Sequence, residues 1–354
     1  MTTLIAAVLV LGLLTSVHEL GHLLAAKRAG LQVDEFGLGY PPRILTLARI
    51  GGTQYTLNLI FFGAFVRLPE EGEPGTHLSD QTKRIRAMFL LGGPLLNLLL
   101  AVVLFSMCFV SGWPVGHDLA VGVKVRPRSV AEAVGFENDD LIVAADGRRV
   151  SSTLDLILYA RSVHGNVRAV TIRRRGRSFL LPLPAGAPWF VKPESRGVKL
   201  CNGAGWVESI SYPWPQAIQQ GLTQALTSAA SLFALAFDVV RGMIPADMVR
   251  PVGPVGIAQL TSQAARQLVD TGGWFPLLHL TATLSAALAA INILPLPGLD
   301  GGRLLFIIIE ALRGKRLDPS KENLIHFVGI ALMLMLILVV TYHDITAPYP
   351  PGGR

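Results

Sequence analysis

The first long apolar run of the chain, residues 4–26, contains three ionisable side chains near its end. They lie in the segment HELGH, residues 18–22. Each charge placed in a membrane-spanning helix costs about 2.5–3.5 kcal/mol, so a favourable interaction must offset this cost. In a helix, His18 and His22 lie on one face, about 6 Å apart along the axis, so that both imidazoles reach one ion. The spacing predicts a metal site of the HExxH pattern, in which two imidazoles bind zinc and Glu19 takes a proton from its water.

Two other interpretations fit the same residues, namely a chance match and a proton relay in a transporter. Ionisable residues are depleted in apolar helices, so a chance match to the pattern is rarer there than elsewhere. We therefore favour the metal site. We also expect this helix to be retained, because it lacks the basic flank and the small-residue cleavage site of a signal peptide.

Hydrophobic residues make up 51% of the 354 residues, which is too high a share for an ordinary soluble protein. The runs long enough to cross a hydrocarbon core are 4–26, 88–110, 277–297 and 324–341. The chain is therefore predicted to be a polytopic α-helical membrane protein with four transmembrane helices.

The net charge of +7 does not indicate nucleic-acid binding, because the basic residues gather at the ends of the apolar runs and along one polar stretch. Basic residues are concentrated between the first two runs and between the last two runs. The positive-inside rule places both of these loops in the cytoplasm, so both termini face outward.

The loop between the first two runs carries the pattern of a β-hairpin. Residues 44–50 and 53–59 are strand-like and are separated by Gly51-Gly52. The continuation, residues 60–66, is too apolar for a free cytoplasmic loop, so we expect a hairpin that dips into the membrane. An ordinary cytoplasmic hairpin is the alternative. A strand edge close to the metal would hold an unwound substrate by strand addition.

Residues 113–190 differ in character from the rest of the chain, because charged residues return and short strand-like pieces alternate with turns. The segment 128–142, followed by Asp146-Gly147, resembles the PDZ domains of membrane and periplasmic proteases. Such domains hold peptides by strand addition, and the alternative is a small domain that only blocks access. We expect residues 213–240, further along, to form a helix on the outer membrane surface.

A zinc ion bound by two histidines of one helix needs a third protein ligand. Asp300 follows the third apolar run in the segment NILPLPGLDGGR, residues 292–303. Pro295 and Pro297 break the helix there, so the Asp300 carboxylate can turn back towards the metal. Taken alone, Asp300 could instead be the N-cap of the next helix.

Five stretches together resemble the site-2 protease family, and within it the RseP-type bacterial regulated intramembrane proteases. They are HELGH, GPLLN at residues 93–97, the PDZ-like insert, PVGPVGIAQ at residues 251–259, and NILPLPGLDGGR. The resemblance implies that His18, His22 and Asp300 bind zinc and that Glu19 is the general base. It also implies that Asn292 and Asn97 engage the substrate backbone or the site.

The resemblance implies an intramembrane zinc metalloprotease of the bacterial cytoplasmic (inner) membrane, with the PDZ-like domain on the extracytoplasmic side. Its expected substrates are single-span membrane proteins already trimmed outside, such as anti-sigma factors or signal-peptide remnants. Membrane lipid and a peptide at the PDZ-like domain are the other expected partners. The alternatives are a non-catalytic PDZ-bearing receptor and a metal-ion transporter.

Two departures from the RseP-type pattern stand out. The chain has room for one PDZ-like domain instead of two, and its hairpin carries IFFGAF, residues 60–65, where that group has an IPLGGY-like phrase. Substrate gating and preference are therefore expected to differ.

The expected organisation runs as follows along the chain: transmembrane helix 1 at 1–29, the cytoplasmic loop and re-entrant hairpin at 30–85, transmembrane helix 2 at 86–112, the PDZ-like α+β domain at 113–190, a linker and surface helix at 191–275, transmembrane helix 3 at 276–314, and transmembrane helix 4 with the tail at 315–354.

Overall fold

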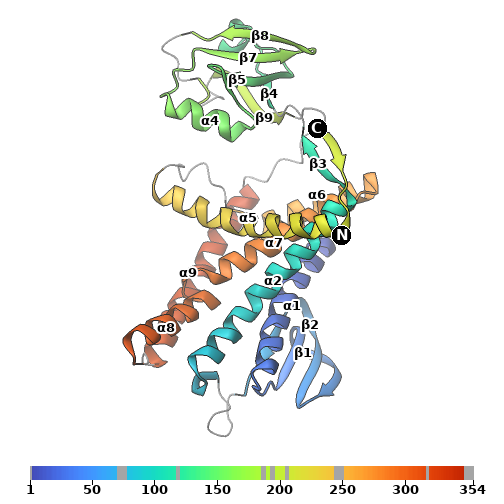
Figure 1. Cartoon of the computed structure of the whole chain (residues 1–354), viewed down its shortest axis with the longest axis vertical. Coiled ribbons are helices and arrows are strands. Elements are labelled where there is room, and N and C mark those ends of the chain that lie inside the picture. Colours follow the sequence, from blue (N-terminus) through green and yellow to red (C-terminus); the bar gives the residue numbers. More distant parts are fainter. Residues whose placement is uncertain are drawn as a thin grey trace. The chain divides into compact units, whose positions relative to one another are not determined.

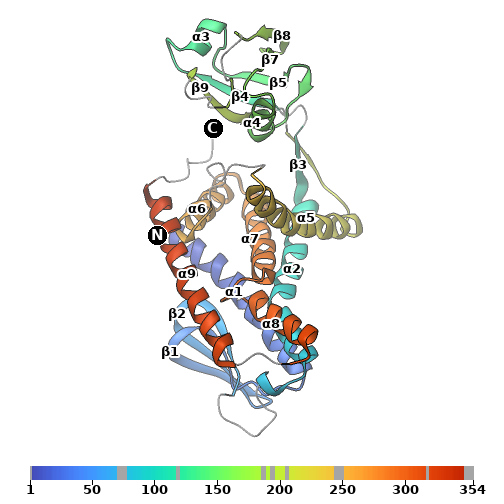
Figure 2. The ribbon, with the colours of Figure 1, turned by 90° about the vertical axis from the view of Figure 1, so that its left-hand side faces the viewer.

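A computed structural model describes most of the chain. The described residues are 2–69, 78–116, 120–184, 189–191, 196–203, 207–242, 251–315 and 319–346. They form two compact units (Figures 1 and 2). The first unit combines Met1–Gly112 with Ser211–Arg354, and the second is Trp113–Ile210.

The first unit is helical apart from one hairpin. Its elements are α1 (Thr2–Arg28), β1 (Glu35–Ile50), β2 (Thr53–Arg67), the 3-10 helix η1 (Leu78–Asp80), α2 (Lys83–Gly112), α5 (Trp214–Val240), α6 (Pro254–Thr271), α7 (Phe275–Ile293), α8 (Asp300–Arg313) and α9 (Pro319–Thr346). The third predicted span is divided into α7 and α8, as the prolines of the intervening loop predict.

Five helices of the described chain are long and apolar enough to cross a membrane, one more than the four expected. The additional helix is α5, within which Trp214–Val239 meets the criterion. Figures 1 and 2 show α5 running across α2, whereas α1 runs alongside α2. Gly221 permits this crossing, because a Cβ there would lie 2.9 Å from the carbonyl oxygen of Val102 on α2. The position of α5 on the outer membrane surface stays a prediction.

A close contact between α1 and α2 brings the histidines of α1 beside α2. Gly21 lies against the backbone of Gly92, and a Cβ on Gly92 would come within 2.8 Å of the Ala25 Cβ. Small residues allow helix backbones to approach in this way inside membranes. The glycine between the two histidines therefore has a packing function of its own.

The hairpin is present, with Ile50 paired to Thr53 across the two-residue Gly51-Gly52 turn. Both strands are longer than expected and fold back on themselves. Residues 35–38 pair with residues 54–57 on one side and with residues 64–67 on the other. The result is a small sheet in place of a simple two-stranded ribbon.

One face of this sheet packs on the helices. The edge formed by residues 44–50 is exposed. The cluster that joins it to α1, α2 and α8 consists of Leu23, Ala26, Leu31, Val33, Phe36, Ala64, Phe89, Leu90 and Ile307. At the opposite edge, the side chains of Ile44, Leu45, Leu47 and Ile50 are all more than half exposed. An exposed apolar edge of this kind fits a membrane-associated hairpin.

The second unit is built on one sheet. Its elements are β3 (Trp113–Gly116), β4 (Ala120–Val125), α3 (Val130–Val134), β5 (Asp140–Ala145), β6 (Arg148–Arg149), α4 (Thr153–Ser162), β7 (Ala169–Arg174), β8 (Arg177–Pro182), β9 (Val198–Gly203) and β10 (Val207–Ile210). The sheet order is β8-β7-β5-β4-β9, with β6 paired to β5, while β3 pairs with β10 separately.

Residues 191–210, expected to begin a linker, belong to this second unit. β9 pairs along the length of β4, from Val125 with Val198 to Ala120 with Gly203. Sheet pairing of this kind is a long-range interaction, so the glycine-rich composition of the segment did not reveal it.

The segment PVGPVGIAQ lies at the start of α6, where two of its backbone N–H groups bind a carboxylate of α9. Asp344 is fully buried, and its Oδ2 accepts hydrogen bonds from the backbone N–H groups of Gly253 (2.9 Å) and Gly256 (2.8 Å). A Cβ at either glycine would lie within 3.0 Å of that oxygen. The glycines thus allow Asp344 to cap α6 and to fasten the end of α9 to it.

An ion pair joins the first turn of α2 to the last turns of α8. Arg86 and Glu310 form a short contact, and their side chains are only 10% and 12% exposed. Lys83 also donates from its Nζ to the carbonyl oxygen of Glu310 (3.3 Å). Since α8 begins at Asp300, this pair helps to fix the helix that carries the candidate third ligand.

Glu310→Ala is expected to lower the free energy of unfolding by about 3 kcal/mol, because it leaves the Arg86 charge buried without its partner. The measurement is the unfolding midpoint in detergent micelles. The double variant Arg86→Met, Glu310→Met removes both charges and should recover most of the loss. Equal destabilisation by the single and double variants would contradict the role given to the ion pair.

Candidate metal centre

Three polar side chains converge at the contact between α1 and the start of α8. His18 Nε2 lies 3.1 Å from Asp300 Oδ2, His22 Nε2 lies 3.3 Å from the same oxygen, and the two Nε2 atoms are 3.2 Å apart. Among the described residues, this is the group of histidine, cysteine and acidic side chains arranged to hold a metal ion. The structure brings together the three residues predicted as ligands.

The triangle of donor atoms matches zinc. With bonds of about 2.0–2.1 Å and tetrahedral angles, the donors around zinc lie roughly 3.3–3.4 Å apart. The three observed separations, 3.1, 3.2 and 3.3 Å, therefore correspond to one face of such a tetrahedron. Two imidazoles and one carboxylate are also a donor set typical of catalytic zinc, with the fourth position open to water.

The orientation of the His22 ring is fixed by a hydrogen bond at its other nitrogen, Nδ1. Its Nδ1 lies 2.8 Å from the carbonyl oxygen of Phe89 on α2, in a buried hydrogen bond. A carbonyl oxygen only accepts, so Nδ1 carries the proton and the Nε2 lone pair is directed at the centre. No sequence feature indicated Phe89, because a backbone carbonyl can belong to any residue.

Asp300 is the first residue of α8, and the alternative assignment as an N-cap does not hold. The N-cap is Leu299, and no side-chain cap hydrogen bond is made there. The close approach of Gly301 to the carbonyls of Ile293 and Leu294 folds the chain back at this point. This turn directs the Asp300 carboxylate at the two histidines.

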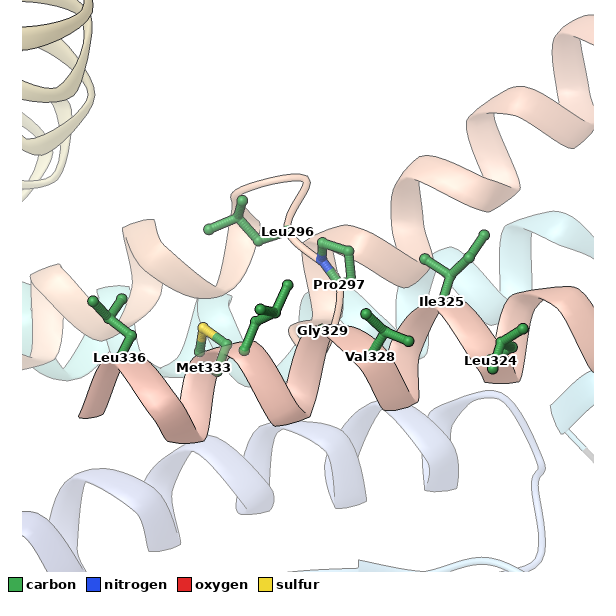
Figure 3. Close-up of a pocket in the computed structure, with 9 residues that line it drawn as sticks. Leu296, Pro297, Leu324, Ile325, Val328, Gly329, Met333 and Leu336 are labelled. Atoms are coloured by element: carbon green, nitrogen blue, oxygen red, sulfur yellow. The ribbon is translucent and has the colours of Figure 1, made fainter. Parts of the chain in front are cut away.

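The loop before Asp300 is held by α9 (Figure 3). His326 of α9 accepts a hydrogen bond at Nδ1 from the Gly298 N–H (3.0 Å). Gly329 of α9 lies directly against Pro297, where a side chain would collide. Leu296 and Pro297 also line an apolar groove together with side chains of α9. The fourth predicted span thus supports the third ligand, a function that the sequence did not reveal.

Glu19 follows His18 on α1 and interacts electrostatically with both histidines and with Asp300. The backbone of Val66, near the end of β2, lies close to its carboxylate. The phenol of Tyr40 on β1 is within electrostatic range of the same carboxylate. The predicted general base therefore lies where the metal ligands meet the small sheet.

The two predicted asparagines lie beside different candidate ligands. Asn292 lies beside Asp300 in a closely packed region formed also by Leu90, Leu91, Pro94, Ile293, Gly301 and Leu304. Asn97 is fully buried on α2, and its amide faces the His18 ring, with Nδ2 3.4 Å from Nδ1. Their engagement of a substrate stays a prediction.

Gly93 leaves the space that the two imidazoles fill. A Cβ added there would lie 2.6 Å from His18 Cε1 and 2.6 Å from His22 Nε2. The glycine pair before Pro94 indicated close helix packing in the sequence. The structure shows that the second of these glycines lies against the metal ligands themselves.

Comparison with known proteins gives a consistent result. The family model described as Peptidase family M50 matches residues 6–336. The chain is 29% identical to zinc metalloprotease RasP of Oceanobacillus iheyensis, over 98% of this chain and 99% of that protein. It is 29% identical to a putative zinc metalloprotease of Clostridium perfringens, with the same coverage. It is 27% identical to the regulator of sigma-W protease RasP of Bacillus subtilis strain 168, over 97% and 98%.

Proposed function

The chain belongs to peptidase family M50, and from this premise we propose that His18, Glu19, His22 and Asp300 form the active site of an intramembrane protease. It is a multi-pass membrane protein and a zinc metalloprotease. The observation that carries the proposal is the triangle of donor atoms, 3.1 to 3.3 Å on each side, with a carboxylate beside it.

The residues divide the chemistry between them. His18, His22 and Asp300 would hold zinc, which would supply polarisation of the scissile carbonyl and a lowered pKa of a bound water molecule. Glu19 accepts the proton that this water loses and returns it to the leaving amine. The carbonyl of Phe89 holds the His22 ring in place, and the loop supported by α9 holds Asp300.

The substrate segment must be extended before it is cut, because a helix hides its carbonyls in hydrogen bonds. We assign the unwound segment to the small sheet. In the described chain, residues 64–67 have a strand neighbour on one side only. A strand added at this edge passes close to Glu19, because Val66 belongs to it. We also assign Asn292, which lies beside Asp300, to bind the substrate backbone.

We assign the second unit as one PDZ-like domain on the extracytoplasmic side of a bacterial inner membrane. Ser129 caps α3 at its N-terminus, Gly135 ends α3 in a left-handed conformation, and Asp146-Gly147 forms the turn between β5 and β6. These are the positions on which the resemblance to protease PDZ domains rests. Such a domain would admit membrane proteins already trimmed outside, including anti-sigma factors or signal-peptide remnants.

The test uses a purified single-span substrate with a short outer stub, in detergent or lipid vesicles. We expect cleavage within the membrane segment, located by mass spectrometry of the products. Stripping the metal with a chelator should abolish cleavage, and added zinc should restore it. The same substrate carrying a folded outer domain should be spared. Cleavage that survives metal removal, or that occurs only outside the membrane segment, would refute the proposal.

A further inference from the structure

We infer that Asn97 is a positioning residue that stabilises the metal-binding tautomer of His18, with its side-chain oxygen as the hydrogen-bond acceptor. The inference rests on the proposed zinc site and concerns how one of its ligands is prepared. His18 lacks the backbone carbonyl that fixes His22. The group that faces its second ring nitrogen is the Asn97 amide.

Asn97 has the burial and the unused atom that this function requires. It is 0% exposed, and its Nδ2 lies 3.4 Å from His18 Nδ1. Its Oδ1 is buried and has no hydrogen-bond partner among the described residues. A buried acceptor without a partner costs about 1–3 kcal/mol, and the orientation shown leaves this oxygen unpaired at that cost.

The chemistry of zinc binding determines which orientation is needed. His18 Nε2 points at the metal position and must offer a lone pair, so Nδ1 of the neutral ring carries the proton. An Nδ1–H group cannot bond to an amide NH2. Turning the amide about its last bond exchanges oxygen and nitrogen with little change in shape. It then places Oδ1 as the acceptor for Nδ1–H and gives the unpartnered oxygen a partner.

The opposite orientation suits the other tautomer. With the proton on Nε2, His18 donates to Asp300 Oδ2 at 3.1 Å and accepts at Nδ1 from the amide NH2. The Asn97 amide therefore matches either tautomer of His18, and its orientation distinguishes a ring ready to bind metal from one bonded to Asp300. A carboxylate or an apolar side chain at this position lacks that property.

The helix turn that carries Asn97 is anchored separately. Ser285 on α7 donates from Oγ to the carbonyl oxygen of Asn97 at 2.7 Å, in a buried hydrogen bond. This contact fixes the backbone without touching the His18 ring. Ser285 therefore provides a matched control, since its removal disturbs the same helix turn and leaves the amide in place.

The test measures zinc affinity by competition with a chromophoric chelator, in detergent micelles, for the wild type and three variants. Asn97→Leu keeps the size of the side chain and removes the acceptor, and should weaken zinc binding by about 10–100-fold. Asn97→Asp retains an acceptor and should keep most of the affinity. Ser285→Ala should bind zinc like the wild type.

The outcomes separate this inference from the proposed function. If the wild-type protein does not bind zinc, the proposed function itself is refuted. A wild type that binds zinc no better than Asn97→Leu overturns only the role of Asn97, as does an Asn97→Asp variant as weak as Asn97→Leu. A measurement without variants uses the zinc-loaded wild type labelled with 15N-histidine. The Nδ1 protons of His18 and His22 should both exchange slowly with water, and a fast-exchanging His18 proton would overturn the inference.

Discussion

Glu19→Gln should abolish peptide cleavage and leave zinc binding intact. The amide has the shape of the carboxylate but cannot accept a proton, and loss of a general base typically slows a reaction by about 10²–10⁴-fold. The three donors are His18, His22 and Asp300, so the substitution removes none of them. The measurement is the cleavage rate of the single-span substrate at equal bound zinc.

The matched control is Asp270→Asn, which removes an exposed carboxylate at the end of α6. It should cleave at the wild-type rate. Two results count against the assignment of Glu19 as general base. One is substantial cleavage by Glu19→Gln, and the other is loss of zinc from this variant, which would make its effect structural.

Gly93→Ala should release zinc, although it adds only a methyl group and removes no donor atom. The new Cβ would lie 2.6 Å from an atom of each imidazole, well inside contact distance. Neither ring has room to yield, because His22 is bonded to Phe89 and His18 faces the buried Asn97 amide. We expect zinc affinity to fall by more than about 100-fold, with cleavage lost in parallel. Chelator competition measures the first effect and product formation the second.

Gly221→Ala provides the comparison for this variant. It also adds a methyl group at a tight helix crossing, since a Cβ there would lie within 2.9 Å of the α2 backbone. That crossing involves α5 and carries no metal ligand. Gly221→Ala should lower stability and retain zinc affinity, whereas equal loss of zinc from both variants would show that helix separation alone disrupts the site.

The three candidate ligands could be selected from the sequence, because each has a local signature. His18 and His22 occur at helical spacing in an apolar run, and Asp300 follows two prolines that break a span. The Gly51-Gly52 turn likewise identified the hairpin before its pairing was known. Physical rules that act over a few residues were sufficient for these features.

The supporting interactions were not predictable in this way, because they join distant segments through groups with no signature. The Phe89 carbonyl behind His22 and the Gly298 N–H bonded to His326 are backbone groups. The pairing of β9 with β4 depends on contact between strands far apart in the chain. The division into α7 and α8 was foreseen from the prolines, but the part of α9 in holding the loop was not.

The order in which the donors are synthesised has a consequence for the cell. His18 and Asp300 are separated by 282 residues. At synthesis rates of about 5–20 residues per second, the ribosome needs roughly 15–55 s to reach the third donor after the first two have been made. During that time the growing chain can expose HELGH to the membrane but cannot complete the zinc site. A nascent chain that has not yet reached Asp300 therefore lacks the third donor of the proposed site, and proteolysis at this site can begin only after residue 300 has been synthesised.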